Sequence, residues 1–434
     1  MAKIDYVVLE RANEFPPLGS GMSLSSQAMR VFDQLGLLED LCKIGIPTEG
    51  FKYFNRKNEL VGTLNAGYYY EERHGYQGIL VPRPALMNFL VSLIPKDKLL
   101  WGKRVLTTMQ NAQGVLCRLT DQTTIHGSIL VGADGAYSAV RQSLYKNMAM
   151  KNKPASKSDT APLRFDQFGV LGITEPIEDL PEETEGGKGG WMLTLLPEKE
   201  TDCLVYVIRL PEGRLGWRIG GKVLSSNMND HENFRRSEWG VEDIEDLKKE
   251  WGDSPAPLVG NVGVLFEKTK HISRIMLEEK VFDTWFEGRT VLIGDACHKM
   301  LPAAGQGTNQ TIMDAVCIAN LIQELSADSA DDIKIAFDRY YTIRASNAKQ
   351  IAQNSARFGS LLTSVGMLAD IKRYLFFNMP TSLHFKGTDA ILACKPILNY
   401  IPNIPMKGVM PDETPPMTVH VGQQDGSNKD TVTH

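Results

Sequence analysis

One segment of the chain, GDACHKMLPAAGQGTNQTIMDA (residues 294–315), combines a carboxylate, closely spaced glycines and the start of a helix. The apolar run TVLIG leads into Asp295, and Gly305 and Gly307 come just before the helical stretch. Glycines let backbone N–H groups approach an anion, and a helix N-terminus adds positive potential. Asp295 is therefore placed to accept hydrogen bonds from sugar or ribityl hydroxyl groups. An ordinary glycine-rich turn gives the same pattern, since short glycine motifs are weak signals alone.

A second segment, SILVGADGAYSAVRQSL (residues 128–144), repeats the order of strand, glycine turn and helix. Asp134 lies between Gly132 and Gly135, where its carboxylate can cap the following helix. Capping a helix and positioning a ligand are compatible roles, so both stay open for Asp134.

Two further charged residues stand at the ends of predicted elements. Arg83 begins the helical stretch RPALMNFLVSLI, although a helix N-terminus is a poor place for a cation unless an anion binds there. Glu10 ends the apolar run of residues 3–9, which predicts a buried strand. In dinucleotide-binding folds an acidic residue at such a strand end binds ribose hydroxyls. For both residues the alternative is an ordinary solvated side chain.

The composition narrows the function classes. The 434 residues exceed the usual size of one domain, and the net charge of −5 argues against nucleic acid as a partner. Six scattered cysteines without a CxxC pair predict neither a disulfide framework nor a metal site. The N-terminus lacks a signal-peptide pattern and no long uncharged apolar run occurs, which favours a cytoplasmic location without a spanning helix.

The order of strand-like and helical stretches predicts an α/β protein. Strands and helices alternate at both ends of this order, while the middle is rich in strands, which indicates a Rossmann-like nucleotide-binding domain interrupted by a β-rich domain and followed by a helical C-terminal region. The predicted boundaries are 1–160 and 276–345 for the two parts of the nucleotide-binding domain, 161–275 for the β-rich domain, 346–410 for the helical region and 411–434 for a disordered tail.

Together and in order, these segments resemble the FAD-dependent monooxygenases of the para-hydroxybenzoate hydroxylase type, in particular the fungal enzymes that epoxidise or hydroxylate apolar secondary metabolites. The segment VLIGDACHKMLPAAGQGTNQTIMDA is similar to their GD motif, and ILVGADGAYSAVR to their DG motif. VVLERA with VFDQLGLLEDL resembles their second strand and the helix after it, and VPRPALMNFL resembles a helix whose arginine contacts FAD. The resemblance covers about residues 5–345.

The resemblance implies that the nucleotide-binding domain is a Rossmann-like FAD-binding domain and that the β-rich domain is a substrate domain. It also implies the cofactors and the site residues. FAD would be held, with NADH or NADPH as co-substrate, and O₂ would be used to hydroxylate or epoxidise an apolar small molecule. The implied FAD contacts are Glu10 at the adenosine ribose, Arg83 and Asp295 near the pyrophosphate and ribityl chain, Asp134 in the DG motif, Gly305, Gly307 and Thr308 at the isoalloxazine turn, and Ser23 through its backbone. Tyr206 is the candidate for a catalytic tyrosine, although a tyrosine in a strand is more often core.

The resemblance leaves one feature unmatched. Such proteins carry a strand, GxGxxG and a helix before the strand that ends in the acidic residue, and the sequence has no such unit ahead of Lys3. Three hypotheses follow: a monooxygenase whose record starts at a misplaced position, a truncated chain that binds flavin weakly or has no activity, and a flavin-dependent reductase or dehydrogenase.

The stretch from 364 to 405 interleaves large apolar residues with lysines and prolines. We expect helices packed on the FAD-binding domain; the alternative is a peripheral membrane contact, which would suit a lipophilic substrate.

Overall fold

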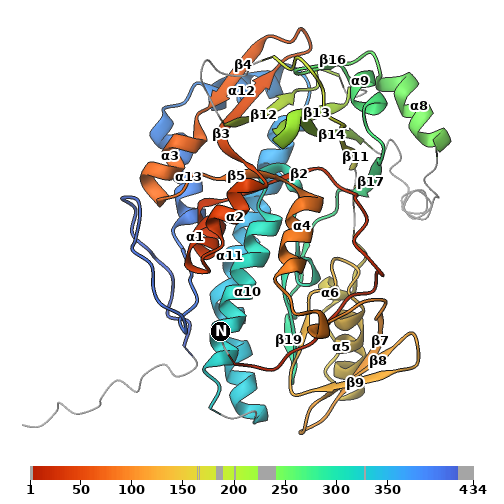
Figure 1. Cartoon of the computed structure of the whole chain (residues 1–434), viewed down its shortest axis with the longest axis vertical. Helices are drawn as coiled ribbons and strands as arrows, with labels where there is room; N and C mark the ends of the chain where they lie inside the picture. Colours follow the sequence, from red (N-terminus) through yellow and green to blue (C-terminus); the bar gives the residue numbers. More distant parts are fainter. Residues whose placement is uncertain are drawn as a thin grey trace, which may run out of the picture.

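The chain forms the α/β architecture that its sequence predicts, with a large sheet, smaller parallel sheets and a helical C-terminal region (Figure 1). A computed structural model describes residues 3–163, 165, 167–181, 189–199, 202–222, 241–326 and 329–418. The acidic, glycine-rich stretch EDLPEETEGGKGG (residues 178–190), whose composition predicts a loop, lies outside the described residues at positions 182–188.

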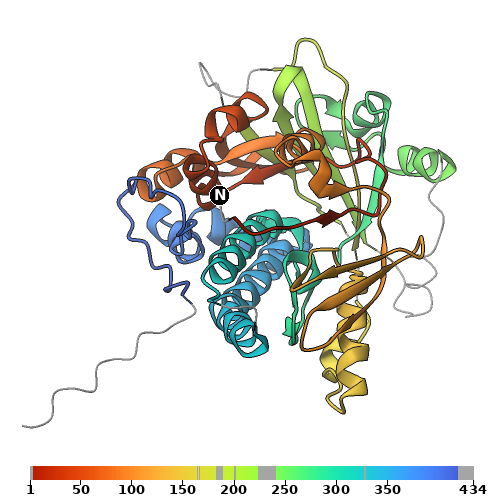
Figure 2. The same cartoon turned by 60° about the horizontal axis from the view of Figure 1, so that its bottom comes forward.

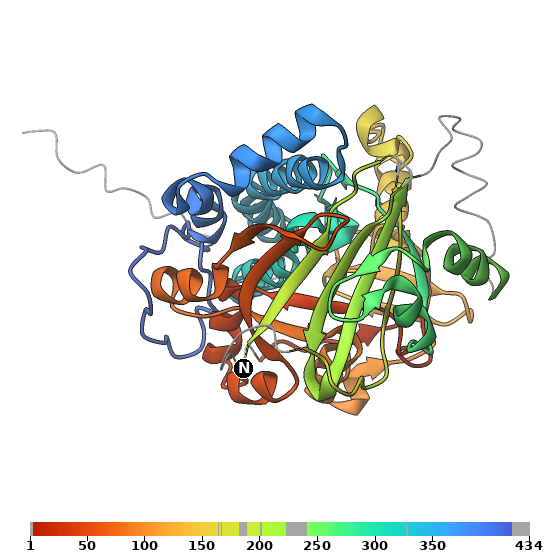
Figure 3. The same cartoon turned by 90° about the horizontal axis from the view of Figure 1, so that it is seen from above.

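A sheet of nine strands forms one half of the molecule, and Figure 3 shows it from above. Its order is β17 (Ser273–Met276), β11 (Gln167–Ile173), β14 (Arg214–Lys222), β13 (Leu204–Leu210), β12 (Gly190–Leu195), β3 (Ile46–Phe54), β5 (Ile79–Pro82) and β2 (Gly21–Leu24), with β4 (Leu60–Leu64) beside β3. Parallel pairing of β12 with β3, Thr194 opposite Tyr53, joins the middle of the sequence to its first quarter. The β-rich unit is therefore not confined to residues 161–275.

The two faces of this sheet have different cover, because successive side chains of a strand point to opposite faces. Val205 and Val207 pack with α8 (Val241–Trp251) and α9 (Val262–Glu267) on the outer face. Tyr206 and Ile208 belong to the opposite face, which we call the inner face; there Ile208 packs with Leu80 of β5.

Two small sheets contain parallel strand pairs at the ends of the motif segments. β1 (Val8–Leu9) pairs in parallel with β6 (Leu99–Leu100), and β10 (Leu130–Gly132) pairs in parallel with β20 (Thr290–Leu292), which pairs antiparallel with β19 (Phe286–Glu287). Within the described residues β1 and β10 each have a strand partner on one side only. Leu9 and Leu130 pack on the same cluster, formed by the meander of β7 (Val105–Gln110), β8 (Val115–Leu119) and β9 (Thr124–Gly127).

The prediction of a buried strand over residues 3–9 is wrong in extent. Only Val8–Leu9 forms a strand, and the side chains of Tyr6 and Val7 are 49% and 40% exposed. An apolar run becomes a buried strand only where partners cover both of its edges and faces, and the described residues supply one partner, β6.

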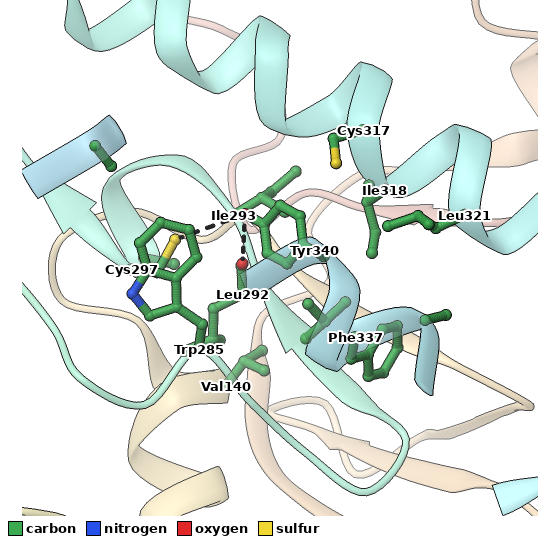
Figure 4. Packing of buried hydrophobic residues seen from close by; sticks show 14 of the residues in the cluster. Val140, Trp285, Leu292, Ile293, Cys297, Cys317, Ile318, Leu321, Phe337 and Tyr340 are labelled. Atoms are coloured by element: carbon green, nitrogen blue, oxygen red, sulfur yellow. Dashed lines mark hydrogen bonds between the residues drawn. The ribbon is translucent and has the colours of Figure 1, made fainter. Parts of the chain in front are cut away.

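Two long helices form the core beside the motif segments. α10 (Gly307–Gln323) and α11 (Ala330–Thr363) run side by side below the large sheet (Figures 1 and 2). Figure 4 shows Tyr340 of α11 directed at β20, where its Oη donates to the Leu292 carbonyl oxygen at 3.2 Å. Because α11 is continuous from 330 to 363, no break occurs at the predicted boundary after residue 345.

The C-terminal region contains α12 (Met367–Phe377) and α13 (Thr381–Leu392) and then a segment without helix or strand to residue 418. Residues 411–418 do not belong to a disordered tail: Asp412 pairs with Arg30 at 2.7 Å, and Met417 is buried in the core cluster of α10 and α11. The polar composition of residues 411–418 does not indicate either contact, the ion pair of Asp412 or the burial of Met417. Residues 419–434 lie outside the described residues.

The remaining elements connect these units. They are α1 (Ser26–Gln34), α2 (Leu38–Lys43), α3 (Ala66–His74), α4 (Arg83–Ser92), α5 (Ala139–Met150), α6 (Lys157–Thr160), β15 (Pro255–Ala256), β16 (Gly260–Asn261), β18 (Lys280–Val281), β21 (His298–Lys299), and the short 3₁₀ helices η1 (Lys96–Lys98), η2 (Pro211–Gly213), η3 (Gly294–Ala296) and η4 (Pro302–Ala304).

Candidate functional site

Two of the predicted acidic residues lie at one edge of a parallel sheet. Asp134 follows β10 and Asp295 lies in η3 just after β20, and the two strands are paired with Gly132 opposite Leu292. The carboxyl ends of parallel strands are where α/β folds bind ligands. The structure therefore brings the DG and GD segments to the same sheet edge.

The two carboxylates have different surroundings. Asp134 accepts hydrogen bonds from the backbone N–H groups of Ala139 and Val140 at 2.7 and 3.1 Å and from the Ser138 hydroxyl, so it caps α5. Asp295 is half-buried and pairs with Lys299 at 2.6 Å, and it remains partly open to solvent. Asp134 thus has a structural role in this chain, while Asp295 keeps acceptor capacity for a ligand.

A buried arginine of α5 ties the two segments together. Arg141 donates to the carbonyl oxygens of Ala296 in η3 and Ala136 in the DG turn, at 2.7 and 2.6 Å. Because a buried guanidinium must satisfy its donors, this contact fixes the spacing between the turns. The sequence predicts a helix that carries Arg141, but it does not indicate which groups this side chain contacts.

The turn between η4 and α10 has an open surface. Gly305 has φ +62°, the left-handed conformation that favours glycine, and Gly307 begins α10. A side chain built at either glycine would meet no atom within 4 Å. No side chain caps the N-terminus of α10. An uncapped helix end facing open space fits a planar or anionic group of a cofactor.

Asn309 connects this turn to β2 and was not predicted from the sequence. Its amide group donates to the carbonyl oxygens of Gly305 and Ser23, at 2.9 and 3.1 Å, and accepts from the N–H of Ser25 at 2.8 Å. The side chain is almost completely buried. Ser23 and Gly305, 282 positions apart in the sequence, are thereby held by one side chain.

Asp314 of α10 is the centre of a buried polar network. Its carboxylate contacts His298 Nε2 at 2.5 Å, accepts from Arg344 Nε of α11 at 2.8 Å, and accepts from the N–H of Gly294 at 3.0 Å. Burial favours the neutral acid, but the charges and hydrogen bonds of His298 and Arg344 outweigh burial and lower the pKa of Asp314 to about 2. The ionised carboxylate fixes η3 against α10.

Cys297, His298 and Asp314 lie close enough to suggest a metal site, yet their chemistry indicates otherwise. The Asp314 carboxylate already has three hydrogen-bond partners, and the fixed positive charge of Arg344 opposes a bound cation. Burial raises the pKa of the Cys297 thiol well above its ordinary value, which disfavours the thiolate that metals bind. His298 has a structural contact here.

The other three predicted FAD contacts lie at exposed or half-exposed positions. Thr308 is the second residue of α10 and is half-buried. Arg83 begins α4, is exposed, and donates to the Leu18 carbonyl oxygen at 3.2 Å. Glu10 follows β1 and accepts from the N–H of Ala12 at 2.8 Å. The side chains of Arg83 and Glu10 thus each contact a backbone group of the described chain.

On the inner face of the large sheet, Tyr206 lies in a row of residues that are opposite one another on adjacent strands. Strand register places Tyr53, Thr194, Tyr206 and Arg218 opposite one another across four strands, about 4.8 Å from strand to strand. Tyr206 and Arg218 keep partial solvent access in the middle of the sheet, and the Arg218 guanidinium lies 5.8 Å from the Tyr206 ring centroid. Arg218 was not singled out from the sequence.

α11 links this row to the turn of Gly305 and Gly307. Gly359 packs against Ala303 of η4, and Leu362, one helical turn later, packs against Tyr53 on the inner face. One turn of a helix rises about 5.4 Å. The open turn and the row of Tyr206 and Arg218 are therefore connected through a single rigid helix.

Comparison with known proteins agrees with this geometry. The family model of the FAD binding domain matches residues 1–211 and 256–355. The FAD-dependent monooxygenase ptmM of Penicillium ochrochloron is 30% identical over 340 residues, which cover 75% of this chain and 74% of that protein. The FAD-dependent monooxygenase ausM of Penicillium brasilianum is 29% identical over 398 residues, covering 86% and 78%.

Solved structures share the fold at lower identity. HpxO of Klebsiella pneumoniae, in complex with FAD and uric acid, superposes with a TM-score of 0.69 at 21% identity, covering 90% of this chain and 91% of that one. A salicylate hydroxylase substrate complex gives 0.61 at 21% identity, covering 87% and 91%.

The open turn generates a first prediction. Gly307→Leu should leave the melting temperature within about 2 °C, because no protein atom lies within 4 Å of a Cβ added there, and should weaken FAD binding at least about tenfold if the flavin rests on this turn. Gly387→Leu in α13, also without neighbours, is the matched control and should bind FAD normally. Unchanged FAD affinity in the Gly307 variant would place the flavin elsewhere.

The buried network generates a second prediction. Asp314→Asn should cost about 3–5 kcal/mol of unfolding free energy, because it leaves Arg344 buried without a charge partner. Asp338→Asn, which breaks an exposed pair with Lys334, should cost about 0.5 kcal/mol or less. Urea titrations of both variants measure the difference.

Low pH should remove the stabilisation that the ionised Asp314 carboxylate gives the folded chain. Its pKa is lowered in the folded chain to about 2, against about 3.9 in an unfolded chain, so its stabilisation is complete above about pH 4 and is lost as the pH falls through 2. The stability gap between the natural chain and Asp314→Asn should therefore narrow between about pH 4 and pH 2. A gap that stays constant would contradict this account of the network.

Proposed function

The chain belongs to the FAD-binding-domain family, and from that premise we propose that it uses NADH or NADPH and O₂ to hydroxylate or epoxidise an apolar organic substrate. It is an FAD-dependent monooxygenase, like its fungal relatives of secondary metabolism. The proposal adds the electron donor and the class of substrate to that assignment.

FAD, when bound, carries electrons from the nicotinamide to O₂, so that one oxygen atom enters the substrate and the other leaves as water. The chain's own residues would hold it by their backbone at Gly305, Gly307 and Thr308. Asp295 would accept hydrogen bonds from hydroxyl groups of the cofactor, and Arg83 would neutralise phosphate charge. Glu10 and Ser23 complete the set of proposed contacts.

The proposal is supported chiefly by the packing contacts of α11, which link the open turn to the inner face of the large sheet. Ala303 lies in η4, just before the open turn. Gly359 of α11 packs against Ala303, and Leu362, one helical turn later, packs against Tyr53. A flavin resting on the turn would therefore lie close to the inner face of the sheet. That is the geometry in which oxygen transfer to a substrate bound on the sheet can occur.

The inner face supports an apolar substrate with one polar group. Met192, Ile208 and Leu210 are buried on this face in one cluster, against which the partly buried Tyr206 packs, and Arg218 lies opposite Tyr206 on β14. Burial raises the pKa of Tyr206 to about 12, so its hydroxyl stays protonated at neutral pH and serves as a hydrogen-bond donor. Arg218 has no carboxylate within ion-pair distance in the described chain and can bind an oxygen of the substrate.

Tyr206 is thus proposed as a catalytic residue that orients a substrate oxygen, and Arg218 as the residue that stabilises negative charge developing on that oxygen. The other hypotheses from the sequence, an inactive flavin-binding relic and a flavin-dependent reductase or dehydrogenase, have no support among the relatives, which are named monooxygenases.

Oxygen incorporation is the direct test. Incubated with FAD, NAD(P)H, isotopically labelled O₂ and a panel of apolar polycyclic substrates, the chain should yield a product that carries one labelled oxygen. Oxidation of NAD(P)H without labelled product across the panel would favour the reductase and contradict the proposal. Mass spectrometry of the extracted products distinguishes the two.

The inner face generates a further prediction. Arg218→Met should raise KM by roughly 10- to 100-fold, since a hydrogen bond to a charged group contributes about 1.5–3 kcal/mol. Arg118→Met on the exposed meander is the control and should not change KM. FAD content should be normal in both variants. If Arg218→Met leaves KM unchanged, the substrate does not bind at this part of the sheet.

A further inference from the structure

α12 presents an apolar face to solvent. Five large side chains recur at positions i, i+1, i+4, i+7 and i+8, which span about 120° of the helix surface. They are 48–80% exposed: Met367, Leu368, Ile371, Tyr374 and Leu375. Scattered apolar side chains are normal on a surface, whereas five on one face of one helix mark an interaction site. No other described residue covers this face, which we call the α12 face.

The opposite side of α12 is anchored, so the α12 face cannot turn inward. Phe377 packs on Tyr53 of β3, with ring centroids 4.6 Å apart, and lies directly over Gly62 of β4. Arg373 is buried and donates to the Leu361 carbonyl oxygen of α11 at 3.1 Å. The helix lies on the outside of the molecule (Figure 3).

A cationic cleft borders the α12 face. It has a volume of about 330 Å³, lies between the end of α11 and α12, and is lined on its polar side by Arg357, Ser360, Ser364 and Lys372. Leu368 belongs to both the cleft and the α12 face. Within the described chain neither Arg357 nor Lys372 has an ion-pair partner.

We propose that the α12 face docks on an anionic phospholipid bilayer. The apolar side chains would enter the boundary between headgroups and acyl chains, and the cleft would receive a lipid phosphate at Arg357 and Lys372. None of the described helices is long and apolar enough to cross a bilayer.

Charge favours a lipid surface over a second copy of the chain. A two-fold contact through the α12 face would place the Arg357 and Lys372 cations on both sides of the interface without supplying an anionic partner from the cleft itself. An anionic bilayer offers the complementary charge beside an apolar layer. The opposite side of α12 packs on the β3–β4 hairpin, which belongs to the same sheet as the inner face.

Vesicle flotation with the full chain tests the proposal. The triple variant Leu368→Ser/Ile371→Ser/Leu375→Ser should bind vesicles of phosphatidylcholine and phosphatidylserine at least about tenfold more weakly than the natural chain. The matched control is Leu106→Ser/Met109→Ser/Met150→Ser, which changes side chains of similar exposure (50%, 56% and 74%) far from α12 and should bind normally. Circular dichroism should show the same helix content in all three proteins.

A separate double variant tests the cationic cleft in the same flotation experiment. Arg357→Glu/Lys372→Glu should abolish the preference for phosphatidylserine vesicles over vesicles of pure phosphatidylcholine. Equal flotation of the natural chain and the α12 triple variant, or an equal loss in the control, would overturn the proposal. So would a chain that ignores vesicles but forms a dimer that the α12 variant dissociates, since the α12 face would then bind a second copy.

Discussion

The buried carboxylate of Asp314 is the contact on which the geometry of the site depends. An ionised group without solvent is costly unless charge partners and hydrogen bonds replace water, and here His298, Arg344 and the Gly294 N–H do so. These partners come from β21, α11 and η3, while Asp314 itself belongs to α10. One side chain therefore sets the positions of the GD segment, of the helix that begins at the open turn, and of the helix that leads to the sheet.

Two other buried side chains extend this arrangement in both directions. Arg141 joins the GD turn to the DG turn, and Asn309 joins the start of α10 to β2. Each makes contacts that only its own donor and acceptor pattern can satisfy, so the connected turns have one relative position. The open surface at Gly305 and Gly307 is consequently preorganised by residues that lie below it.

The sequence predicted the parts of the site whose signals are local. Glycines, an apolar run and the following helix all lie within residues 294–315, and the structure forms that turn as expected. Non-local contacts gave no such signal: the parallel pairing of β12 with β3, the row that includes Arg218, and the three-way contact of Asn309. The opening strand and the tail were misjudged for the same reason, since partners elsewhere in the chain decide whether residues 3–9 extend a sheet and whether Asp412 is anchored.

If these contacts form a working FAD site, the chain binds flavin in a fixed ratio. This ratio of bound flavin to protein can be measured from the visible flavin absorbance of the purified, desalted chain after saturation with FAD. We expect about one FAD per chain. A protein that stays colourless at every FAD concentration, while circular dichroism shows it folded, would contradict it.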